Sequence, residues 1–436
     1  MIHDVARAAG EVAYARLTAA AQDKLRLCLL ANVSVALAGA SAVRLPVPAA
    51  GSAHRLFSGA RAAEARSAAG FNAAAMHART QDDFHPIGNL HIATVALPAL
   101  LAAAEVQPGP GERLLDALAA GYAVATGLSK RFSPITTPRG LRSTCLYAPF
   151  GATAAVARQW RFSVEETANA LALTASLVGG TTQCWLDGSD EYQLHVAQGA
   201  AHALLACELT LAGVRGGAGA LDGQAGLYAS LTGEQPRFAD IAADFNADAA
   251  LLDTVLKRYP VSGICQPVVL ACEKLAPRLA GRRIERVKMV MRAFELSYPG
   301  TDNRGPFRSF SDRLMSARWC VASVLTAGRF DFEAFVQPAS DAVEQLVARI
   351  ELSGDTALPP LSCRVRVHCA DGAVIEHDAI DAGQQLAINA DSLRDWAVPL
   401  WQVSRRDPAA FDRAAAAVAG GAAAPVAEML AACLPG

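Results

Sequence analysis

The chain has 436 residues, with 39 basic and 41 acidic side chains and a formal net charge of −2. Its hydrophobic content of 52% excludes intrinsic disorder, because there is enough apolar surface to offset the entropy of the chain. The near-neutral charge excludes the basic surface that nucleic-acid binding needs, so we expect a small-molecule partner and no nucleic acid.

The first 250 residues are predicted to be mainly helical, because alanine and leucine dominate and both favour helices. Helices are expected over 19–39, 92–105, 112–128, 148–159 and 164–177. Their apolar residues lie on all sides, which is typical of helices buried in a large bundle. The capping box of Ser163 and Glu166 marks the start of the last one.

The pattern changes after about residue 270. Residues 283–291 and 361–369 alternate polar and apolar side chains, and Asp371-Gly372 separates the second run from 373–377, which predicts strands and a hairpin. Helical segments are expected between these strands at 314–326 and 341–349, and again at 393–401, 411–419 and 424–433. The predicted fold is mainly α: a large all-helical domain formed by both chain ends (1–268 and 395–436) plus an inserted α+β lid domain (269–394).

No segment is predicted to span a membrane. The two most apolar candidates are 93–104, which is short and contains Pro98, and 196–214, which contains His202 and Glu208. The first sixteen residues are charged throughout and resemble no signal peptide. The ten cysteines form no C-x-x-C pair, so we expect small buried thiols that stay reduced. A soluble, cytoplasmic protein is expected.

The densest group of polar residues is 76–91. It holds His77, Arg79, Thr80, Asp82, Asp83, His85 and His91. Adjacent carboxylates beside imidazoles suit general acid–base catalysis, because each group shifts the pKa of the others. A solvated loop with helix-capping aspartates explains the same composition. A metal site is the third alternative, but the D-D-x-H spacing fits no standard ligand pattern, so we predict no metal.

Four further polar groups follow. Residues 130–147 contain Lys130, Arg131, Arg139 and Arg142 and no acid, which suits either a carboxylate-binding loop or an ordinary surface loop. The others are 185–195, 257–267 and 301–312, and the last two lie near the expected domain boundary, where ligand sites are common. None of these groups contains a nucleophile elbow, a P-loop or a dinucleotide-binding motif.

The order of these groups resembles the MmgE/PrpD superfamily, which includes 2-methylcitrate dehydratase, cis-aconitate decarboxylase and iminodisuccinate epimerase. The resemblance covers nearly the whole chain and is carried by blocks at 72–91, 121–124, 140–151, 164–173, 187–201 and 257–266. It implies the two-domain fold given above, with the site between the domains. It also implies a homodimer that needs no metal or organic cofactor.

Several positions depart from the family pattern where chemistry is expected. The leading aspartate of the family's Asp-x-Asp-Asp block falls on Thr80, its lysine before the conserved Leu-His falls on Tyr192, and its histidine after Tyr-Pro falls on Gln266. A family histidine is replaced by Arg142, whereas His91 is retained. Tyr192 removes a fixed positive charge and Gln266 removes a group that titrates near neutral pH, whereas Arg142 restores one cation, so we expect a substrate with fewer or differently placed carboxylates than the family's polycarboxylates.

The resemblance and the residues together give the expected site. The predicted catalytic residues are His91, Tyr147, Tyr192 and Asp82, and the predicted substrate-binding residues are Arg79, Thr80, His85, Arg142, Gln266 and Lys257. The first hypothesis is a cofactor-independent lyase, a dehydratase or decarboxylase, that transfers a proton next to a carboxyl group of a small carboxylate. An isomerase or epimerase is the second, and a catalytically silent metabolite-binding homologue is the third.

Overall fold

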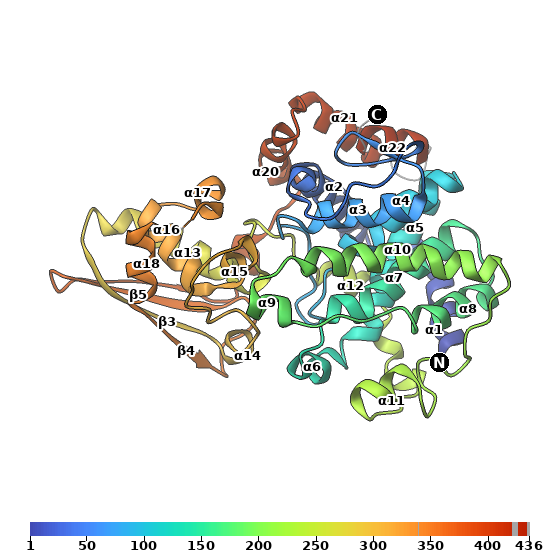
Figure 1. Ribbon diagram of the computed structural model, residues 1–436, viewed down its shortest axis with the longest axis horizontal. Coiled ribbons are helices and arrows are strands. Elements are labelled where there is room, and N and C mark those ends of the chain that lie inside the picture. The colour runs from blue at the N-terminus through green and yellow to red at the C-terminus, as the bar shows by residue number, and fades with distance from the viewer. Residues whose placement is uncertain (339, 421–425, 434–436) are drawn as a thin grey trace. The chain divides into compact units, whose positions relative to one another are not determined.

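The computed structural model describes residues 1–338, 340–420 and 426–433, and it is mainly helical (Figure 1). The chain divides into two compact units. The larger unit comprises Met1–Thr181, Glu191–Leu256 and Asn389–Gly436, and the smaller unit comprises Thr182–Asp190 and Lys257–Ile388. This division of the chain falls at 256/257 and 388/389, the sequence-based boundaries at 268/269 and 394/395 stay a prediction, and the short segment 182–190 belongs to the smaller unit.

The larger unit is a bundle of helices. Its principal members are α1 (Ile2–Glu11), α2 (Ala19–Gly39), α3 (Ala65–His77), α4 (Ala93–Val106), α5 (Gly111–Ser129), α7 (Ser143–Gln159), α8 (Val164–Thr174), α10 (Glu191–Leu211), α20 (Ala390–Val403), α21 (Pro408–Ala419) and α22 (Val426–Cys433). Short helices α6 (Ser133–Thr136), α11 (Leu227–Thr232) and α12 (Ala247–Leu252) lie in its connections. The predicted helices are confirmed, except that residues 424 and 425 of the last one lie outside the described residues, and the capping box at Ser163 starts α8.

The sequence predicted an all-helical domain, but the larger unit also contains strands. Two short strands, β1 (Ala50–Arg55) and β2 (Arg61–Ala62), pair antiparallel between α2 and α3. Small and polar residues fill β1, so it has no alternating pattern that would reveal a strand.

Helices α5 and α7 pack very closely, and glycine permits the approach. A Cβ added at Gly151 would lie 2.4 Å from the carbonyl oxygen of Gly121. Only residues without a side chain fit where two helix backbones come this near. The abundance of alanine and glycine in this half of the sequence therefore serves close backbone packing.

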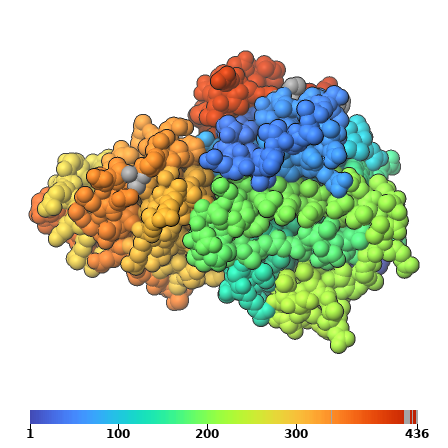
Figure 2. All heavy atoms as spheres, in the orientation of Figure 1, coloured from blue at the N-terminus to red at the C-terminus, as the bar shows by residue number. Residues whose placement is uncertain are grey.

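Helix α2 joins the two ends of the chain. It packs against α20, so the N-terminal and C-terminal segments lie side by side (Figures 1 and 2). By length and composition α2 could cross a membrane, but 72% of its most apolar window is buried inside the protein. It is a stronger candidate than the two segments that the sequence singled out, and its burial identifies it as a core helix of this bundle.

The smaller unit contains a four-stranded sheet with the order β4-β3-β5-β6. Its strands are β3 (Ile284–Arg292), β4 (Ile350–Asp355), β5 (Cys363–Cys369) and β6 (Val374–Ala379), and only the β3–β4 pair is parallel. The predicted hairpin of β5 and β6 is confirmed. Helices α13 (Gln266–Leu279) and α16 (Ala317–Ala327) share the apolar core of this sheet, and shorter helices α9 (Gln183–Asp187), α14 (Ala293–Leu296), α15 (Phe310–Met315), α17 (Phe332–Val336), α18 (Asp341–Val347) and α19 (Gly383–Leu386) complete the unit.

All ten cysteines are free and buried, as expected. Burial raises the pKa of several of these thiols, to about 12 for Cys28, so they stay protonated. They act as small apolar side chains in both units.

Candidate active site

The polar segment between α3 and α4 forms the centre of the candidate site. Helix α3 ends at His77, and the backbone then turns through Thr80, which has a positive φ of 49°. Two short bridges hold the rest of the segment, Phe84 to Val255 and His85 to Leu90. The interpretation as a solvated loop is wrong, because Asp82 and Asp83 are each only 1% exposed.

The carboxylate of Asp82 accepts hydrogen bonds from two side chains and lies in close contact with a third. The Nδ1 atom of His77 lies 3.0 Å from Oδ1, and the Thr94 hydroxyl donates to Oδ2 at 2.6 Å. The Nδ1 atom of His91 lies 2.8 Å from Oδ2. Two donors and the adjacent imidazole of His91 converge on one buried carboxyl group and stabilise its anionic form, which accepts hydrogen bonds only.

Arg142 determines which nitrogen of His77 carries the proton. One guanidinium nitrogen of Arg142 lies 2.7 Å from Nε2 of His77. A guanidinium group can only donate, so Nε2 is the acceptor and the proton of the neutral ring sits on Nδ1, facing Asp82. Burial lowers the pKa of His77 to about 3, which keeps the ring neutral.

Arg142 contacts a second imidazole through its other terminal nitrogen. That nitrogen donates to the carbonyl oxygen of Tyr192 at 3.0 Å and lies 3.3 Å from Nδ1 of His195. Burial and the adjacent guanidinium lower the pKa of His195 to about 4. The positive charge of Arg142 is therefore held between two neutral rings. We refer to Asp82, His77, His91, Thr94 and Arg142 as the Asp82 cluster.

His91 is the member of this cluster that reaches solvent. Its side chain is 20% exposed, whereas the side chains of Asp82 and His77 are 0% and 1% exposed. Its Nδ1 atom also lies 2.8 Å from the backbone oxygen of Asp83. Both partners of Nδ1 are acceptors, so this nitrogen carries the proton and the lone pair of the neutral ring is on Nε2.

The neighbouring aspartate has a different environment. The Tyr122 hydroxyl donates a short hydrogen bond to one oxygen of Asp83, and the backbone N–H of Asp83 donates to Asn32 at 3.1 Å. Burial raises the pKa of this carboxyl group to about 6. Asp83 therefore anchors the segment to Asn32 and Tyr122, and the carbonyl oxygen of Asp83 orients His91.

The two predicted tyrosines lie in different surroundings. The ring of Tyr192, in α10, packs edge-on against His77 at 5.7 Å, and its hydroxyl donates to the carbonyl oxygen of Ala78 at 3.2 Å. The hydroxyl of Tyr147, in α7, lies 3.4 Å from Thr136, and burial raises its pKa to about 12. Tyr192 is thus the tyrosine that contacts the Asp82 cluster.

The predicted substrate-binding residues are only partly brought together. Arg142 belongs to the cluster, and Arg79 and Thr80 lie beside it in the same buried segment. His85 faces Asp253 at 3.9 Å instead, where burial and Lys130 lower its pKa to about 4. The other cations of 130–147 bind elsewhere on the larger unit: Lys130 pairs with Asp253, Arg131 pairs with Glu234 and Arg139 bonds to the carbonyl oxygen of Leu231.

Gln266 and Lys257 belong to the smaller unit. The side chain of Gln266 bonds to both the N–H and the carbonyl oxygen of Tyr259, at 3.1 and 2.8 Å, and so braces its own loop. Lys257 is 1% exposed. Their assignment to substrate binding stays a prediction.

Two members of the cluster, His77 and Thr94, were not among the residues predicted to be catalytic or substrate-binding. His77 ends an apolar helix, where a lone histidine gives no signal beyond its place in a polar segment. Thr94 lies in the first turn of α4, in an otherwise apolar run, and nothing in that run identifies it as a hydrogen-bond donor. Both become evident only from the fold.

The cluster also contains a set of atoms of the type that binds metals. His77, Asp82 and His91 each offer a ligand atom within 4.8 Å of the others. A divalent cation there would face the guanidinium group of Arg142, which contacts His77 directly. Like charges repel, so the donor set favours proton transfer over metal binding.

Comparison with known families agrees with the resemblance seen in the sequence. The family model described as the MmgE/PrpD N-terminal domain matches residues 3–239. The match spans more than half of the chain and contains every member of the Asp82 cluster. A comparison with curated proteins found no match.

Proposed function

Since the chain belongs to the MmgE/PrpD family, in which dehydratase-type and related activities occur, we propose that it is a lyase acting on a small carboxylate. The proposed reaction is the elimination of water across a carbon–carbon bond next to a carboxyl group. It uses side chains of this chain and requires no cofactor.

The arrangement of His91 carries the proposal. With its proton on Nδ1 and facing Asp82, the ring presents the Nε2 lone pair as a base. Nε2 takes a proton from the carbon next to the carboxyl group, and the C–H electron pair forms the new double bond. The hydroxyl group leaves the neighbouring carbon and takes up a proton to become water. Asp82 stabilises the imidazolium that results.

Two further residues complete the proposed mechanism. Arg142 supplies a positive charge that attracts the substrate carboxylate and stabilises the charge that develops on it during proton abstraction. Tyr192 is the tyrosine we assign as proton donor to the leaving group, because its ring packs against His77 of the cluster. An ordinary phenol has a pKa of about 10, so it suits an acid better than a base.

Proton NMR in D2O on a panel of carboxylates tests the proposal. The panel comprises citrate, 2-methylcitrate, cis-aconitate, iminodisuccinate and malate. We expect new olefinic signals from the hydroxy acids with the wild-type protein and their loss with His91→Ala. His3→Ala changes an exposed histidine of α1 and is the matched control. Full turnover by His91→Ala would overturn the assignment of the base.

An isomerase or epimerase is the second candidate, favoured by the same observation. A base at Nε2 of His91 can return its proton to the carbon instead of waiting for a leaving group. The NMR experiment separates the two reactions, because exchange of the C–H signal for deuterium without an olefinic product indicates isomerisation. Silence of the wild-type protein across the panel would favour a metabolite-binding homologue.

A further inference from the structure

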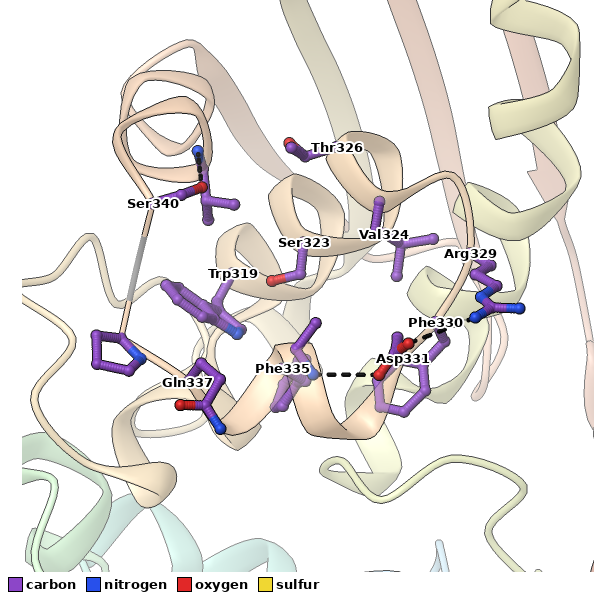
Figure 3. Close-up of a pocket in the computed structure, with 14 residues that line it drawn as sticks. Trp319, Ser323, Val324, Thr326, Arg329, Phe330, Asp331, Phe335, Gln337 and Ser340 are labelled. Atoms are coloured by element: carbon purple, nitrogen blue, oxygen red, sulfur yellow. Dashed lines mark hydrogen bonds and ion pairs between the residues drawn. The ribbon is translucent and has the colours of Figure 1, made fainter.

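The smaller unit contains a cavity that takes no part in the proposed reaction. It has a volume of about 290 Å³ and lies among α16, α17 and α18 (Figure 3). Its wall is mainly apolar and includes the aromatic rings of Trp319, Phe330 and Phe335. The Phe330 and Phe335 rings lie 5.3 Å apart, and Trp319 meets Phe335 edge-on at 6.1 Å.

Two polar atoms in this wall have no hydrogen-bond partner among the residues that the structure describes. They are Nε1 of Trp319 and the hydroxyl oxygen of Ser323. Trp319 is 2% exposed, so its indole N–H is shielded from the solvent at the protein surface. The two residues are four apart in α16 and therefore share one face of the helix, where Figure 3 shows them next to each other. Buried donors normally find an acceptor, so this pair indicates a missing one.

Three of the other polar residues of the wall have partners. Asp331 accepts the N–H of Ala334 at 3.1 Å and caps α17, and Ser340 caps α18 in the same way. Arg329 and Asp331 lie 3.6 Å apart, so their charges offset each other. Thr326 and Gln337 also line the cavity but are exposed, so Trp319 and Ser323 supply the buried donors without a described partner on a mainly apolar, nearly neutral wall.

We propose that this cavity binds a small neutral aromatic molecule that carries a carbonyl group. The aromatic walls favour a flat apolar ring, and the carbonyl oxygen accepts hydrogen bonds from Nε1 of Trp319 and the hydroxyl of Ser323. The size is suitable, because a dry apolar cavity of roughly 150 Å³ holds benzene. The proposal does not depend on the reaction assigned to the Asp82 cluster.

Indole N–H resonances of tryptophan, labelled with ¹⁵N in the full chain, test the site. Acetophenone is the probe, and ethylbenzene, which lacks the carbonyl oxygen, is its matched control. Titration with acetophenone is expected to move the Trp319 resonance downfield and to saturate. Ethylbenzene is expected to bind at least about fivefold more weakly and to cause no downfield shift, because it offers no acceptor.

Two variants sharpen the test. Trp319→Phe assigns the resonance, and Ser323→Ala should weaken acetophenone binding about fivefold. Ser297→Ala, at an exposed serine of the same unit, should leave the affinity unchanged. The indole groups of Trp160 and Trp401 serve as internal references, since they already donate to Ala103 and Ser34.

Three results would overturn the proposal. The first is no saturable change at Trp319. The second is an equal downfield shift with acetophenone and ethylbenzene, because the carbonyl group would then be irrelevant. The third is an equal shift at Trp160 and Trp401, which would indicate non-specific association. Should Trp319→Phe fail to fold, Ser323→Ala still identifies the resonance, because it removes only a hydroxyl group beside that indole.

Discussion

The Asp82 cluster and the cavity wall of α16 both bury polar groups, but they differ in whether these groups have hydrogen-bond partners. In the cluster, Asp82 accepts hydrogen bonds from His77 of α3 and Thr94 of α4, and Nδ1 of His91 lies 2.8 Å from it. On α16, Trp319 and Ser323 hold donors without an acceptor among the described residues. A buried hydrogen bond is worth little net stability, whereas a missing partner is costly. The cluster is complete within the chain, and the cavity wall is completed by a ligand.

The largest expected effect is that of Asp82→Asn, a change in the Asp82 cluster. The amide no longer stabilises an imidazolium at His91, so we expect turnover in the NMR assay to fall about 10²- to 10⁴-fold. The protein should remain folded by circular dichroism. Asp253→Asn is the matched control, since that carboxylate also faces an imidazole, His85, outside the cluster. Equal losses in the two variants would contradict a special role for Asp82.

Glu295, in α14 of the smaller unit, offers a second buried group that lacks one described partner, although it does not line the cavity. One of its oxygens accepts the N–H of Leu361, the other has no partner among the described residues, and burial raises its pKa to about 7. The folded protein then binds the proton more tightly than the unfolded chain, so stability falls as the pH rises from about 4.5 to 7. In Glu295→Gln, the loss of stability over this pH range should be smaller by about 2 kcal/mol.

Urea unfolding of the wild type and Glu295→Gln at pH 5 and pH 8 measures that difference. Glu285→Gln, at an exposed position of β3, should show the wild-type dependence on pH. Parallel pH profiles for the wild type and Glu295→Gln would mean that this carboxyl group keeps an ordinary pKa.

Thr94→Val and Ser323→Ala compare a hydroxyl group that has a partner with one that has none. Thr94→Val removes a charge-assisted hydrogen bond to Asp82, so the free energy of unfolding should fall by about 1.5 kcal/mol. Ser323→Ala loses no such bond and should change it by less than about 0.5 kcal/mol. Urea denaturation checks both values, and equal costs would break the comparison.

Two tryptophans give the smallest and best matched contrast. Trp319 and Trp401 are both buried, and each ring has a guanidinium group over it, at 5.2 and 5.4 Å. Only the indole of Trp401 has a described acceptor, Ser34 at 2.8 Å. Trp401→Phe should therefore cost about 1 kcal/mol more than Trp319→Phe in thermal or urea unfolding. The reverse order would contradict the missing partner at Trp319.

Much of the fold follows from local patterns in the sequence. The buried helices and the strands β3, β5 and β6 carry clear periodicities, and the Asp371-Gly372 turn sets the hairpin. Strand β4 was not predicted, because Ser353, Gly354 and Asp355 interrupt its alternation at the edge of the sheet. Strand formation there depends on pairing with β3, which local sequence does not encode.

The sequence singled out the polar segment of the candidate site but not its environment. Residues 76–91 stand out by composition, yet composition alone favours solvent exposure for so many charges. Their burial depends on partners far along the chain: Asn32, Tyr122 and Arg142 bond to Asp83 or His77. The roles of Arg142 and Thr94 likewise depend on contacts that only the folded bundle creates.

The pairing of α2 with α20 has a consequence for synthesis of the protein. The indole of Trp401 bonds to Ser34 across 367 residues, and the whole smaller unit is translated between the two partners. Ribosomes add about 5–20 residues per second, so α2 is synthesised roughly 20 s or more before α20 emerges. During that interval the apolar face of α2 that α20 later covers is exposed on the nascent chain. Newly made chains should therefore depend on chaperones until α20 has left the ribosome.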